Sequence, residues 1–565
     1  MPRAVELLQQ GRNEELWQLG CGFISLNTEQ FMAIQKRLLL EQIELLNHCA
    51  FGNKVMRGAR PETIEEFRQQ VPLTTYSDYC PELAEKREDI LPRKPALWVH
   101  TSGRSGEYPC KWVPMTPEYA HALTEVMCGL AILSTCKGWG DTSALHDHPK
   151  IVYTVAPRPY MSGALASLLQ EQVTADYLPP LDEAEGLPFE DRIKLGFQQA
   201  LSQGLDFFFG LSLVLAAVGD KFTQSSNKVD IRPFLSQPKA LLRLTKGLVK
   251  SKLGRRPLLP KDLWSVKGIM SSGLDSMVYK DKIKELWGRC PLDIYSSTEG
   301  GIIATQTWDY DGMTFIPSLN FLEFIPEEEH WKWQLDHGYQ PRTVLLDEVE
   351  AGKNYEIVLT NFHGGAMVRY RIGDMVKITS LRNEKLGINI PQMVFERRAD
   401  DLLDFVTLRL TEKTIWQAIE GAGIAYKDWT ARKKVGEPVL QLFIELKDGY
   451  HASEADVAAA VHEQILNSDN DSYTTSLVHE DLTDMVNFRV EANLLPDGAF
   501  ANYTAQRQAE GADLAHLKPS HINPSDKVLS LLMAKPEVAP EVKVAAEAAA
   551  SPVSYTHLRA HETVL

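Results

Sequence analysis

The sequence predicts an α/β fold with a mainly parallel sheet, a β-rich subdomain and a second, smaller lobe. Two observations support this prediction. Apolar strand-like runs alternate with helical stretches in the first half of the chain, and β-rich runs with little helix between them follow. The 565 residues are 44% hydrophobic and 24% charged, which is an ordinary globular composition in a chain long enough for more than one domain.

The first half is expected to open with an amphipathic helix over Thr28–Cys49, because apolar residues recur there at helical spacing. Strands and crossover helices of a parallel sheet are expected next. The strands are predicted at Ala96–His100, Lys150–Val155, Val266–Ser271 and Leu292–Tyr295, and the helices at Pro117–Leu133 and Asp281–Gly288. The apolar run Phe207–Val218 is expected to be a core helix or a pocket wall.

The second half is expected to begin with an antiparallel subdomain and to continue into a separate lobe from near Asp400. The β-rich runs of the subdomain are Thr314–Ile325, Tyr355–Thr360 and Met375–Thr379. The lobe is predicted to contain strands at Leu440–Leu446 and Val486–Val490 and helices at Glu412–Gly421 and Ser453–Ile465. We expect domains at 1–398 and 399–531, followed by a Pro/Ala/Glu-rich disordered tail, 532–565, whose last residues resemble translated adapter sequence.

Charge and cysteine content argue against several classes of protein. The chain has 59 Lys and Arg against 75 Asp and Glu, a net charge of −16, and nucleic-acid binding usually needs clustered basic residues. Seven cysteines without a CxxC pair favour a reducing compartment, so we expect a cytoplasmic protein. No secretion signal is visible, and the most apolar run is about twelve residues long where a membrane span needs roughly 20. We expect no membrane partner.

Two segments carry residue types that suit a nucleotide phosphate site. In HTSGRSGEYPCKWVPMT, His100–Thr116, a Thr/Ser/Gly-rich turn follows a strand and precedes Lys111, although the Walker A order is absent. In LDIYSSTEGG, Leu292–Gly301, Tyr295 suits purine stacking, Thr298 suits a phosphate and Glu299 suits Mg²⁺. A plain surface turn is the competing interpretation of each segment.

Two later segments add charged groups. In VRYRIGDM, Asp374 follows a glycine turn and suits a ribose diol, whereas Arg369 and Arg371 alternatively pair with surface acids. The segment FERRADDLLD, Phe395–Asp404, is charge-dense, and such a run is usually a solvated face. The histidines of HDHP, His146 and His148, are too few for a metal site, so we expect a solvated loop there.

These segments occur in one succession together with VPLTTYSDY, SSGLDS, IPSLNFLEFIP, GKNYEIVLTNFHGGAMVRYRIGD and GAFANYTAQRQAEGADLAHLKPSHI. In this succession the chain resembles the plant auxin- and jasmonate-conjugating acyl acid amido synthetases, the Gretchen Hagen family of the acyl-adenylate-forming ANL superfamily. The resemblance covers about Phe67–Ile522. It implies a large N-terminal adenylate-forming domain with mixed sheets and a β-rich subdomain, plus a smaller, mobile α+β C-terminal lid domain.

The resemblance also implies roles for individual positions. The family's phosphate-binding loop corresponds here to Thr101, Ser102, Gly103, Ser105 and Gly106, together with Lys111. The segment that flanks adenine corresponds to Ser272 and Gly273. Tyr295 corresponds to the aromatic position, Thr298 to the phosphate-contacting position and Glu299 to the Mg²⁺-associated position. The ribose-binding position corresponds to Asp374, the nucleotide-contacting arginine to Arg398, the hinge to Asp400 and the late catalytic lysine to Lys518.

One departure concerns the phosphate loop, where Arg104 stands in place of the usual Thr or Ser and the spacing to Lys111 is one residue longer. Arg104 either supplies a charge to pyrophosphate or blocks loop closure. The other concerns Arg409, which aligns with a phosphate-facing lysine of plant members.

The implied reaction uses ATP and Mg²⁺ to activate a carboxylic acid as an acyl-adenylate and then transfers the acyl group to an amine, usually an amino acid. Glu299, Thr298, Lys518 and Lys111 are the expected catalytic residues. Coenzyme A as acceptor and a catalytically degraded nucleotide-binding protein stay open as alternatives. The chain is expected to be a monomer or a homodimer.

Overall fold

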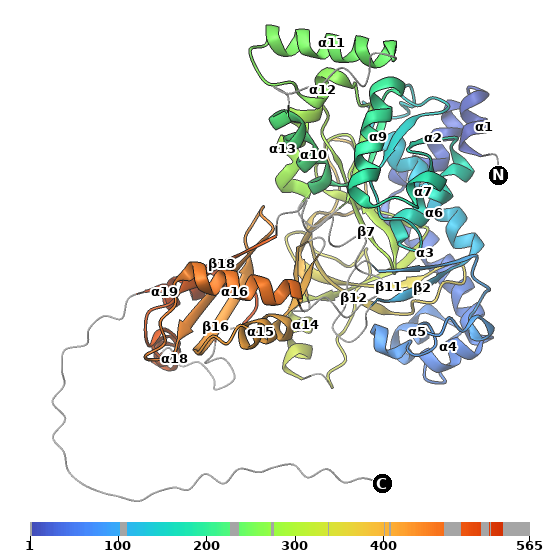
Figure 1. Cartoon of the computed structure of the whole chain (residues 1–565). Coiled ribbons are helices and arrows are strands. Elements are labelled where there is room, and N and C mark those ends of the chain that lie inside the picture. Colours follow the sequence, from blue (N-terminus) through green and yellow to red (C-terminus); the bar gives the residue numbers. More distant parts are fainter. Residues whose placement is uncertain are drawn as a thin grey trace, which may run out of the picture. The chain divides into compact units, whose positions relative to one another are not determined.

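The structure of the chain, a computed structural model, is mixed α/β (Figure 1). It describes residues 3–101, 110–225, 237–272, 276–336, 338–399, 402–405, 408–467, 488–509, 519 and 521–534. The chain divides into two compact units, one formed by Met1–Leu494 with Ser520–Pro524 and the other by Leu495–Pro519 with Ser525–Leu565.

An 11-stranded sheet organises the larger unit, with the strand order β10-β11-β12-β13-β9-β8-β7-β6-β5-β3-β4. The parallel strands are β3 (Lys150–Tyr153), β4 (Asp176–Leu178), β5 (Phe207–Leu211), β6 (Gly268–Ser272) and β7 (Leu292–Ser297). The antiparallel strands are β8 (Gly301–Thr305), β9 (Met313–Phe315), β10 (Asn320–Pro326), β11 (Asn354–Asn361), β12 (Tyr370–Ser380) and β13 (Gln392–Arg398). The expected antiparallel subdomain is therefore confirmed, and it extends the same sheet.

Crossover helices accompany the parallel half, because parallel neighbours need a connection that runs back over the sheet. Alternate side chains of β3 belong to different hydrophobic cores: Ile151 and Tyr153 to one, Val152 to the other. The first core includes residues of α6 (Pro117–Leu133) and α7 (Met161–Gln172), and the second includes residues of α9 (Phe189–Gln203), α10 (Ser212–Ser225) and α13 (Ser276–Trp287). Both faces of the parallel half are thus buried.

The helix expected at Thr28–Cys49 is α3 (Thr28–Asn47). It begins where it does because Asn27 accepts a hydrogen bond from the Gln30 N–H and the Gln30 side chain accepts one from the Asn27 N–H. Other helices of the larger unit are α1 (Ala4–Gln9), α2 (Asn13–Cys21), α4 (Ala50–Val55), α5 (Ile64–Gln70), α8 (Leu181–Ala184), α11 (Pro238–Leu253), α12 (Pro260–Leu263) and α14 (Glu327–Leu335).

Two elements differ from the sequence-based expectation. The run at Ala96–His100 forms β1 (Leu97–His100), but β1 pairs antiparallel with β2 (Trp112–Met115) in a separate two-stranded sheet. The connection between them is too short for a crossover, so β1 does not join the parallel sheet. The run Phe207–Val218 is strand β5 followed by the first turns of α10.

The described residues between 402 and 494 include a two-stranded sheet, β14–β15, and a three-stranded sheet, β16–β17–β18, with a hydrophobic core of their own. Strand β17 (Val439–Leu446) pairs antiparallel with β16 (Tyr426–Lys433) and parallel with β18 (Arg489–Leu494). The other elements are β14 (Leu402–Asp404), β15 (Arg409–Thr411), α15 (Glu412–Gly421) and α16 (Glu454–Asn467). In the smaller unit, α18 (Ala499–Ala509) contacts α19 (Asp526–Met533).

The seven cysteines are free thiols, as their number and spacing predict. Burial raises the pKa of the Cys128 and Cys136 thiols to about 12, so they stay protonated at neutral pH. Among the described residues, no helix is both long and apolar enough to cross a bilayer.

Candidate active site

The predicted site residues that the structure describes lie around the point where the parallel half of the sheet meets the antiparallel half. Strand β7 is the last parallel strand, and a tight turn through Thr298 and Glu299 leads into β8, which is antiparallel to it. Ligands of open α/β sheets bind beyond the carboxyl ends of the strands. Glu299 is buried at this position, with 8% of its surface exposed.

Tyr295, Asp374 and Arg398 form one hydrogen-bonded cluster. The Tyr295 hydroxyl donates to Asp374 Oδ2 at 2.7 Å, and Arg398 Nη1 donates to Asp374 Oδ1 at 2.5 Å. Asp374 and Arg398 are cross-strand partners on β12 and β13. Burial and the neighbouring Asp374 carboxylate raise the pKa of Tyr295 well above its usual range, so its hydroxyl remains a donor. Three segments far apart in the sequence thus meet on one carboxylate.

This cluster changes what Asp374 offers a ligand. Each carboxylate oxygen accepts a hydrogen bond within the protein, whereas the sequence-based expectation gave both oxygens to a ribose. A carboxylate oxygen has two lone pairs, so each oxygen retains the capacity to accept a further hydrogen bond.

Lys111, Tyr370 and Glu299 form a second cluster. Lys111 Nζ lies 3.5 Å from Glu299 Oε1 and 3.0 Å from the Tyr370 hydroxyl, and that hydroxyl donates to Glu299 Oε1 at 3.0 Å. Burial and the Glu299 carboxylate raise the pKa of Tyr370 well above its usual range. The motif analysis did not single out Tyr370, although it stands between two arginines that did attract attention.

Two asparagines that the sequence analysis also missed hold the turn at Glu299. Asn361 Nδ2 donates to the Glu299 carbonyl at 2.9 Å and to Asn320 Oδ1 at 2.8 Å, and Asn320 Nδ2 donates to the Gly300 carbonyl at 2.7 Å. Gly300 is closely packed, because a Cβ there would lie 2.6 Å from the Leu359 side chain. The strand pair β10–β11 therefore holds the backbone of the turn at two successive carbonyl groups.

Thr101 and Lys111 lie at the two ends of the proposed phosphate loop. The Thr101 hydroxyl accepts from the Lys111 N–H at 3.0 Å, and the Thr101 N–H donates to the Lys111 carbonyl at 3.1 Å. The loop itself, with Ser102, Gly103, Arg104, Ser105 and Gly106, lies outside the described residues, as do Gly273, Asp400 and Lys518. The backbone of Ser272 ends strand β6.

The arginines of VRYRIGDM pair with acids, but with buried ones. Arg369 donates to Glu323 at 2.8 and 2.9 Å, and Arg371 donates to Glu356 at 2.7 and 2.9 Å. His330 Nδ1 lies 2.7 Å from Glu356 Oε2. The expectation of surface pairs is wrong, because other segments cover both arginines: Arg369, directly before β12, also donates to the Arg68 and Val71 carbonyls, and Arg371 lies over the Trp333 ring of α14.

Among the described residues that the sequence suggested for metal binding, Glu299 is the candidate that the structure supports. His146 and His148 lie within 3.3 Å of Asp206 and Asp176, respectively, and the described residues contain no group of three or more His, Cys, Asp or Glu that suits a metal ion. Mg²⁺ in nucleotide sites is usually bound by one or two carboxylates together with substrate phosphates and waters. A single buried carboxylate at the strand end fits that type of site.

Comparisons with known proteins agree with the motif analysis. Residues 21–144 match the model of the GH3 family N-terminal domain, and residues 313–398 match that of the GH3 family central domain. GH3 is the Gretchen Hagen family, so the resemblance drawn from the motifs is confirmed.

Curated relatives match parts of the chain. The jasmonoyl–L-amino acid synthetase JAR4 of Nicotiana attenuata is 35% identical over 169 residues, which is 29% of this chain and 27% of that protein. The 4-substituted benzoates-glutamate ligase GH3.12 of Arabidopsis thaliana is 28% identical over 240 residues, 39% of this chain and 38% of that protein. The chain therefore spans less than half the length of these two relatives.

Solved structures share the fold over most of the chain. An acyl acid amido synthetase, GH3.15, has a TM-score of 0.50 at 15% identity and covers 94% of this chain and 97% of its own. A 2-hydroxyisobutyryl-CoA ligase, solved with 2-HIB-AMP and CoA, has a TM-score of 0.51 at 16% identity and covers 83% of this chain and 86% of its own. At these identities the likeness concerns the fold alone.

Proposed function

We propose that this chain, similar to the GH3 family in its N-terminal and central regions, is an ATP-dependent acyl acid amido synthetase. A carboxylic acid reacts with ATP to give an acyl-adenylate and pyrophosphate, and an amine, preferably of an amino acid, then displaces AMP to give an amide. The observation that carries the proposal is the meeting of two buried polar clusters, Tyr295–Asp374–Arg398 and Lys111–Tyr370–Glu299, near the carboxyl end of β7.

In the first half-reaction a carboxylate oxygen attacks the α-phosphorus of ATP, and the bond to pyrophosphate breaks. Both reactants are anionic, so oriented cations and N–H donors must offset their repulsion. We assign this task to Lys111 and to the backbone of the loop from Ser102 to Gly106, with Thr298 donating to the α-phosphate.

The nucleotide is assigned to the first cluster. Asp374 accepts from the ribose hydroxyls through its remaining lone pairs, and Arg398 contacts the nucleotide while donating a hydrogen bond to Asp374. Tyr295 is almost fully buried, with 5% of its surface exposed, so its hydroxyl positions Asp374 while its ring lies beside the base. Ser272 and Gly273 flank the adenine.

We assign Mg²⁺ to Glu299, where the ion would neutralise the charge of the ATP phosphates. The chain's own contribution is to keep that carboxylate in place: Tyr370 donates to Oε1, and Asn361 fixes the backbone of the turn.

A C-terminal lid domain, 399–531, is assigned the task of bringing Lys518 toward the α-phosphate during adenylation, the first half-reaction. The enzyme is proposed to be cytoplasmic and either monomeric or homodimeric. Coenzyme A remains the second acceptor to test, because a CoA ligase shares the fold as closely as an amido synthetase does.

The test is release of pyrophosphate with ATP and Mg²⁺ across aryl, indolyl and fatty carboxylic acids, with pooled amino acids or coenzyme A added. We expect acid-dependent release that amino acids increase. If coenzyme A increases pyrophosphate release and amino acids do not, the product is a thioester and not an amide. If the chain binds ATP but releases no pyrophosphate with any of the acids, it is a nucleotide-binding protein and not an enzyme.

A further inference from the structure

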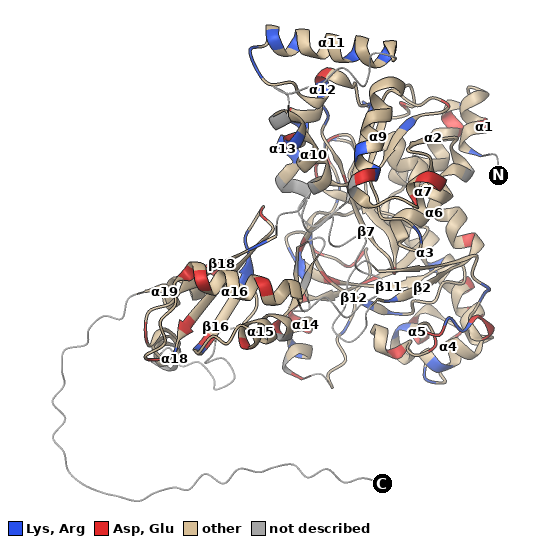
Figure 2. Ribbon diagram, in the orientation of Figure 1, with Lys and Arg blue, Asp and Glu red and all other residues tan. Residues whose placement is uncertain are grey.

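Helix α11 is the most basic helix of the larger unit. Its sequence, PKALLRLTKGLVKSKL, contains four lysines and one arginine and no acidic residue, although the whole chain has a net charge of −16. Figure 2 shows basic but no acidic residues along it. Such a concentration of one sign of charge requires an explanation in an acidic protein.

One side of α11 is fixed to the protein. Ala240, Leu244, Gly247 and Ser251 are buried, and α11 contacts α9 and α12. A Cβ at Gly247 would lie 2.6 Å from the Leu263 side chain, so the helix approaches α12 closely. Packing therefore determines which side of the helix faces solvent.

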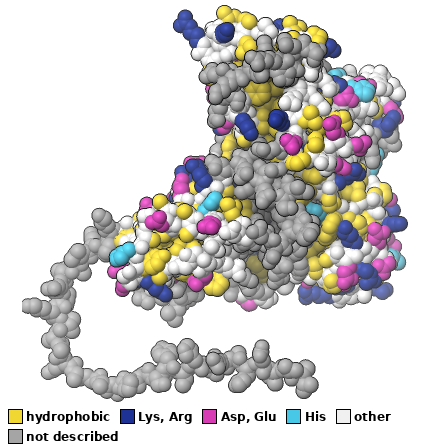
Figure 3. Space-filling view, viewed as in Figure 1, with side chains coloured by type: hydrophobic (Ala, Val, Ile, Leu, Met, Phe, Trp, Pro, Cys, Tyr) yellow, Lys and Arg dark blue, Asp and Glu magenta, His cyan; other side chains and the backbone are white. Residues whose placement is uncertain are grey.

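The opposite side carries a ridge of exposed apolar residues: Leu242, Val249 and Leu253 are 65%, 50% and 81% exposed. With about 100° of rotation per residue, these three positions lie within roughly 40° of one another and opposite the buried positions. Figure 3 shows hydrophobic and basic side chains together at the end of the molecule that α11 forms. The three large apolar residues are aligned along one side of the helix, so they form a continuous surface and are not isolated exposed residues.

Lysines flank this ridge on both sides. By helical spacing, Lys239, Lys246 and Lys250 lie along one side and Lys252 along the other. All four are exposed, and none makes an ion pair with an acid of the described residues. The fifth cation, Arg243, instead donates to the Ala200 carbonyl at 2.8 Å. Within the described part of the chain, the four ammonium groups are therefore exposed and outside any ion pair.

We propose that the exposed face of α11, defined by Leu242, Val249 and Leu253 with the four flanking lysines, binds the surface of an anionic lipid bilayer. The helix lies in the plane of the interface, the apolar ridge enters the boundary between headgroups and acyl chains, and the lysines reach lipid phosphates and carboxylates on either side.

The charge pattern favours a bilayer over a protein partner. Cores of protein interfaces are depleted of lysine, and here lysines border an apolar ridge that is only one residue wide. Helices that lie on membranes typically combine basic residues with an apolar face, and each lysine near an anionic surface contributes about 1 kcal/mol. The sequence-based expectation of no membrane partner rested on the lack of a spanning segment, which this mode of binding does not need.

The test is co-sedimentation of the full chain with vesicles of phosphatidylcholine alone and of phosphatidylcholine and phosphatidylserine in equal parts, at low and high salt. We expect binding to the anionic vesicles only, with loss at high salt. The double variants Leu242→Ser/Leu253→Ser and Lys246→Glu/Lys250→Glu should each weaken binding roughly tenfold or more.

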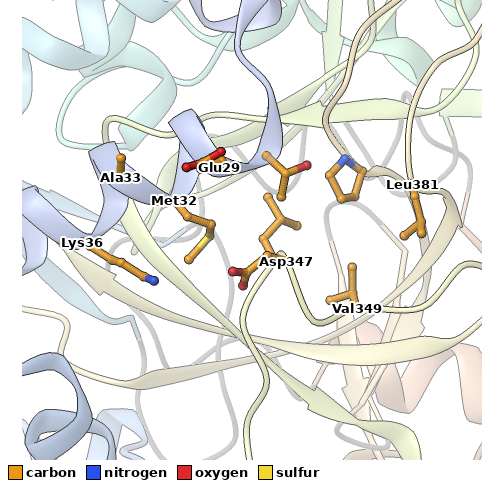
Figure 4. Close-up of a pocket in the computed structure, with 10 residues that line it drawn as sticks. Glu29, Met32, Ala33, Lys36, Asp347, Val349 and Leu381 are labelled. Atoms are coloured by element: carbon orange, nitrogen blue, oxygen red, sulfur yellow. The ribbon is translucent and has the colours of Figure 1, made fainter.

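Matched controls come from a separate hollow of about 490 Å³, whose lining includes Met32 and Lys36 of α3, Asp347 and Leu381 (Figure 4). Leu381 is 51% exposed, so Leu381→Ser and Lys36→Glu each make one substitution of the same type away from α11 and should bind as the native chain does. Circular dichroism shows whether each variant is folded.

Equal binding to neutral and anionic vesicles would overturn the proposal, as would no binding at low salt or equal loss in the control variants. If the chain binds a polyglutamate peptide but does not bind the vesicles, the partner of α11 is an acidic protein and not a bilayer. The measurement needs neither ATP nor an acyl substrate, so its outcome is independent of the proposed enzymatic function.

Discussion

The two faces of strand β12 place their polar side chains in different surroundings. On one face Arg371 donates two hydrogen bonds to the buried Glu356, and Arg369, the residue directly before β12, donates two to the buried Glu323. On the other face Tyr370 and Asp374 contact groups from the phosphate loop, β7 and β13. One strand thus joins an internal ion-pair network to the candidate site, because alternate residues of a strand point in opposite directions.

Because the two faces have different surroundings, substitutions on β12 can separate effects on stability from effects on activity. Buried ion pairs whose partners lie within the sheet contribute to stability, and removal of one partner leaves an uncompensated charge. Polar groups at the carboxyl end of β7 are in reach of a ligand. Changes on the first face should therefore affect unfolding, and changes on the second face should affect catalysis.

The largest effect is expected for Arg369→Met, which leaves Glu323 buried without its principal cation. The free energy of unfolding should fall by about 3–5 kcal/mol, measured by urea denaturation. The double variant Arg369→Met/Glu323→Leu should recover most of the loss. A decrease under about 1 kcal/mol in the single variant would show that this face does not carry the stability we assign to it.

Lys111→Met should lower carboxylate-dependent pyrophosphate release by roughly 10²–10³-fold, because it removes the cation that we assign to the reacting phosphates. The free energy of unfolding should fall by less than in Arg369→Met, because Glu299 keeps the hydrogen bond from Tyr370. Lys332→Met, which removes an exposed lysine paired with Glu329, is the matched control and should keep native activity. Equal rates in the two variants would remove Lys111 from the reaction.

Tyr370→Phe should lower the same rate about tenfold, since Glu299 loses one of the hydrogen bonds that hold it. The KM for ATP should stay nearly constant, because the hydroxyl acts through Glu299. Tyr339 also donates to a glutamate, Glu329, at 2.6 Å, so Tyr339→Phe removes an equivalent bond away from the site and should leave the rate unchanged. A rate equal to that control would contradict the positioning role.

The smallest effect concerns pH. Burial opposes ionisation of Glu356, but hydrogen bonds from His330 and Arg371 outweigh it and lower the pKa of the carboxyl. The ionised carboxylate therefore contributes stability above its unfolded pKa of about 4.3, and this contribution is lost as the pH falls through the folded pKa. Urea denaturation between neutral and acidic pH should show a shallower decrease for Glu356→Gln. An identical pH dependence would contradict the assignment.

Sequence reasoning predicted the elements better than their partners. Apolar runs located the parallel strands β3, β6 and β7 and the helices α3, α6 and α15 to within a few residues, because burial imposes the periodicity directly, whereas β4 was not predicted and β5 was expected to be a helix or a pocket wall. The pairing of β1 with β2 was missed, since an apolar run shows that a strand forms and not which edge it joins.

The candidate site divides in the same way. Tyr295 and Glu299 stand out because they lie at the end of a strand-like run, Asp374 because it follows a glycine turn, and Arg398 only through the resemblance to the family. Asn320 and Asn361 act through side-chain bonds to the backbone across the sheet, and such bonds leave no local pattern. Tyr370 was missed because its sequence neighbours are two arginines that pair with buried glutamates, whereas its own side chain points the other way, toward Glu299.

The most direct test of the central claim is carboxylate-dependent exchange of labelled pyrophosphate into ATP by the native chain and by Glu299→Gln. The native chain should exchange label only when a suitable carboxylic acid is present. Glu299→Gln should lose the exchange while its urea denaturation curve stays close to native. Native exchange in Glu299→Gln would contradict the account, because the turn after β7 would then not be where the acyl-adenylate forms.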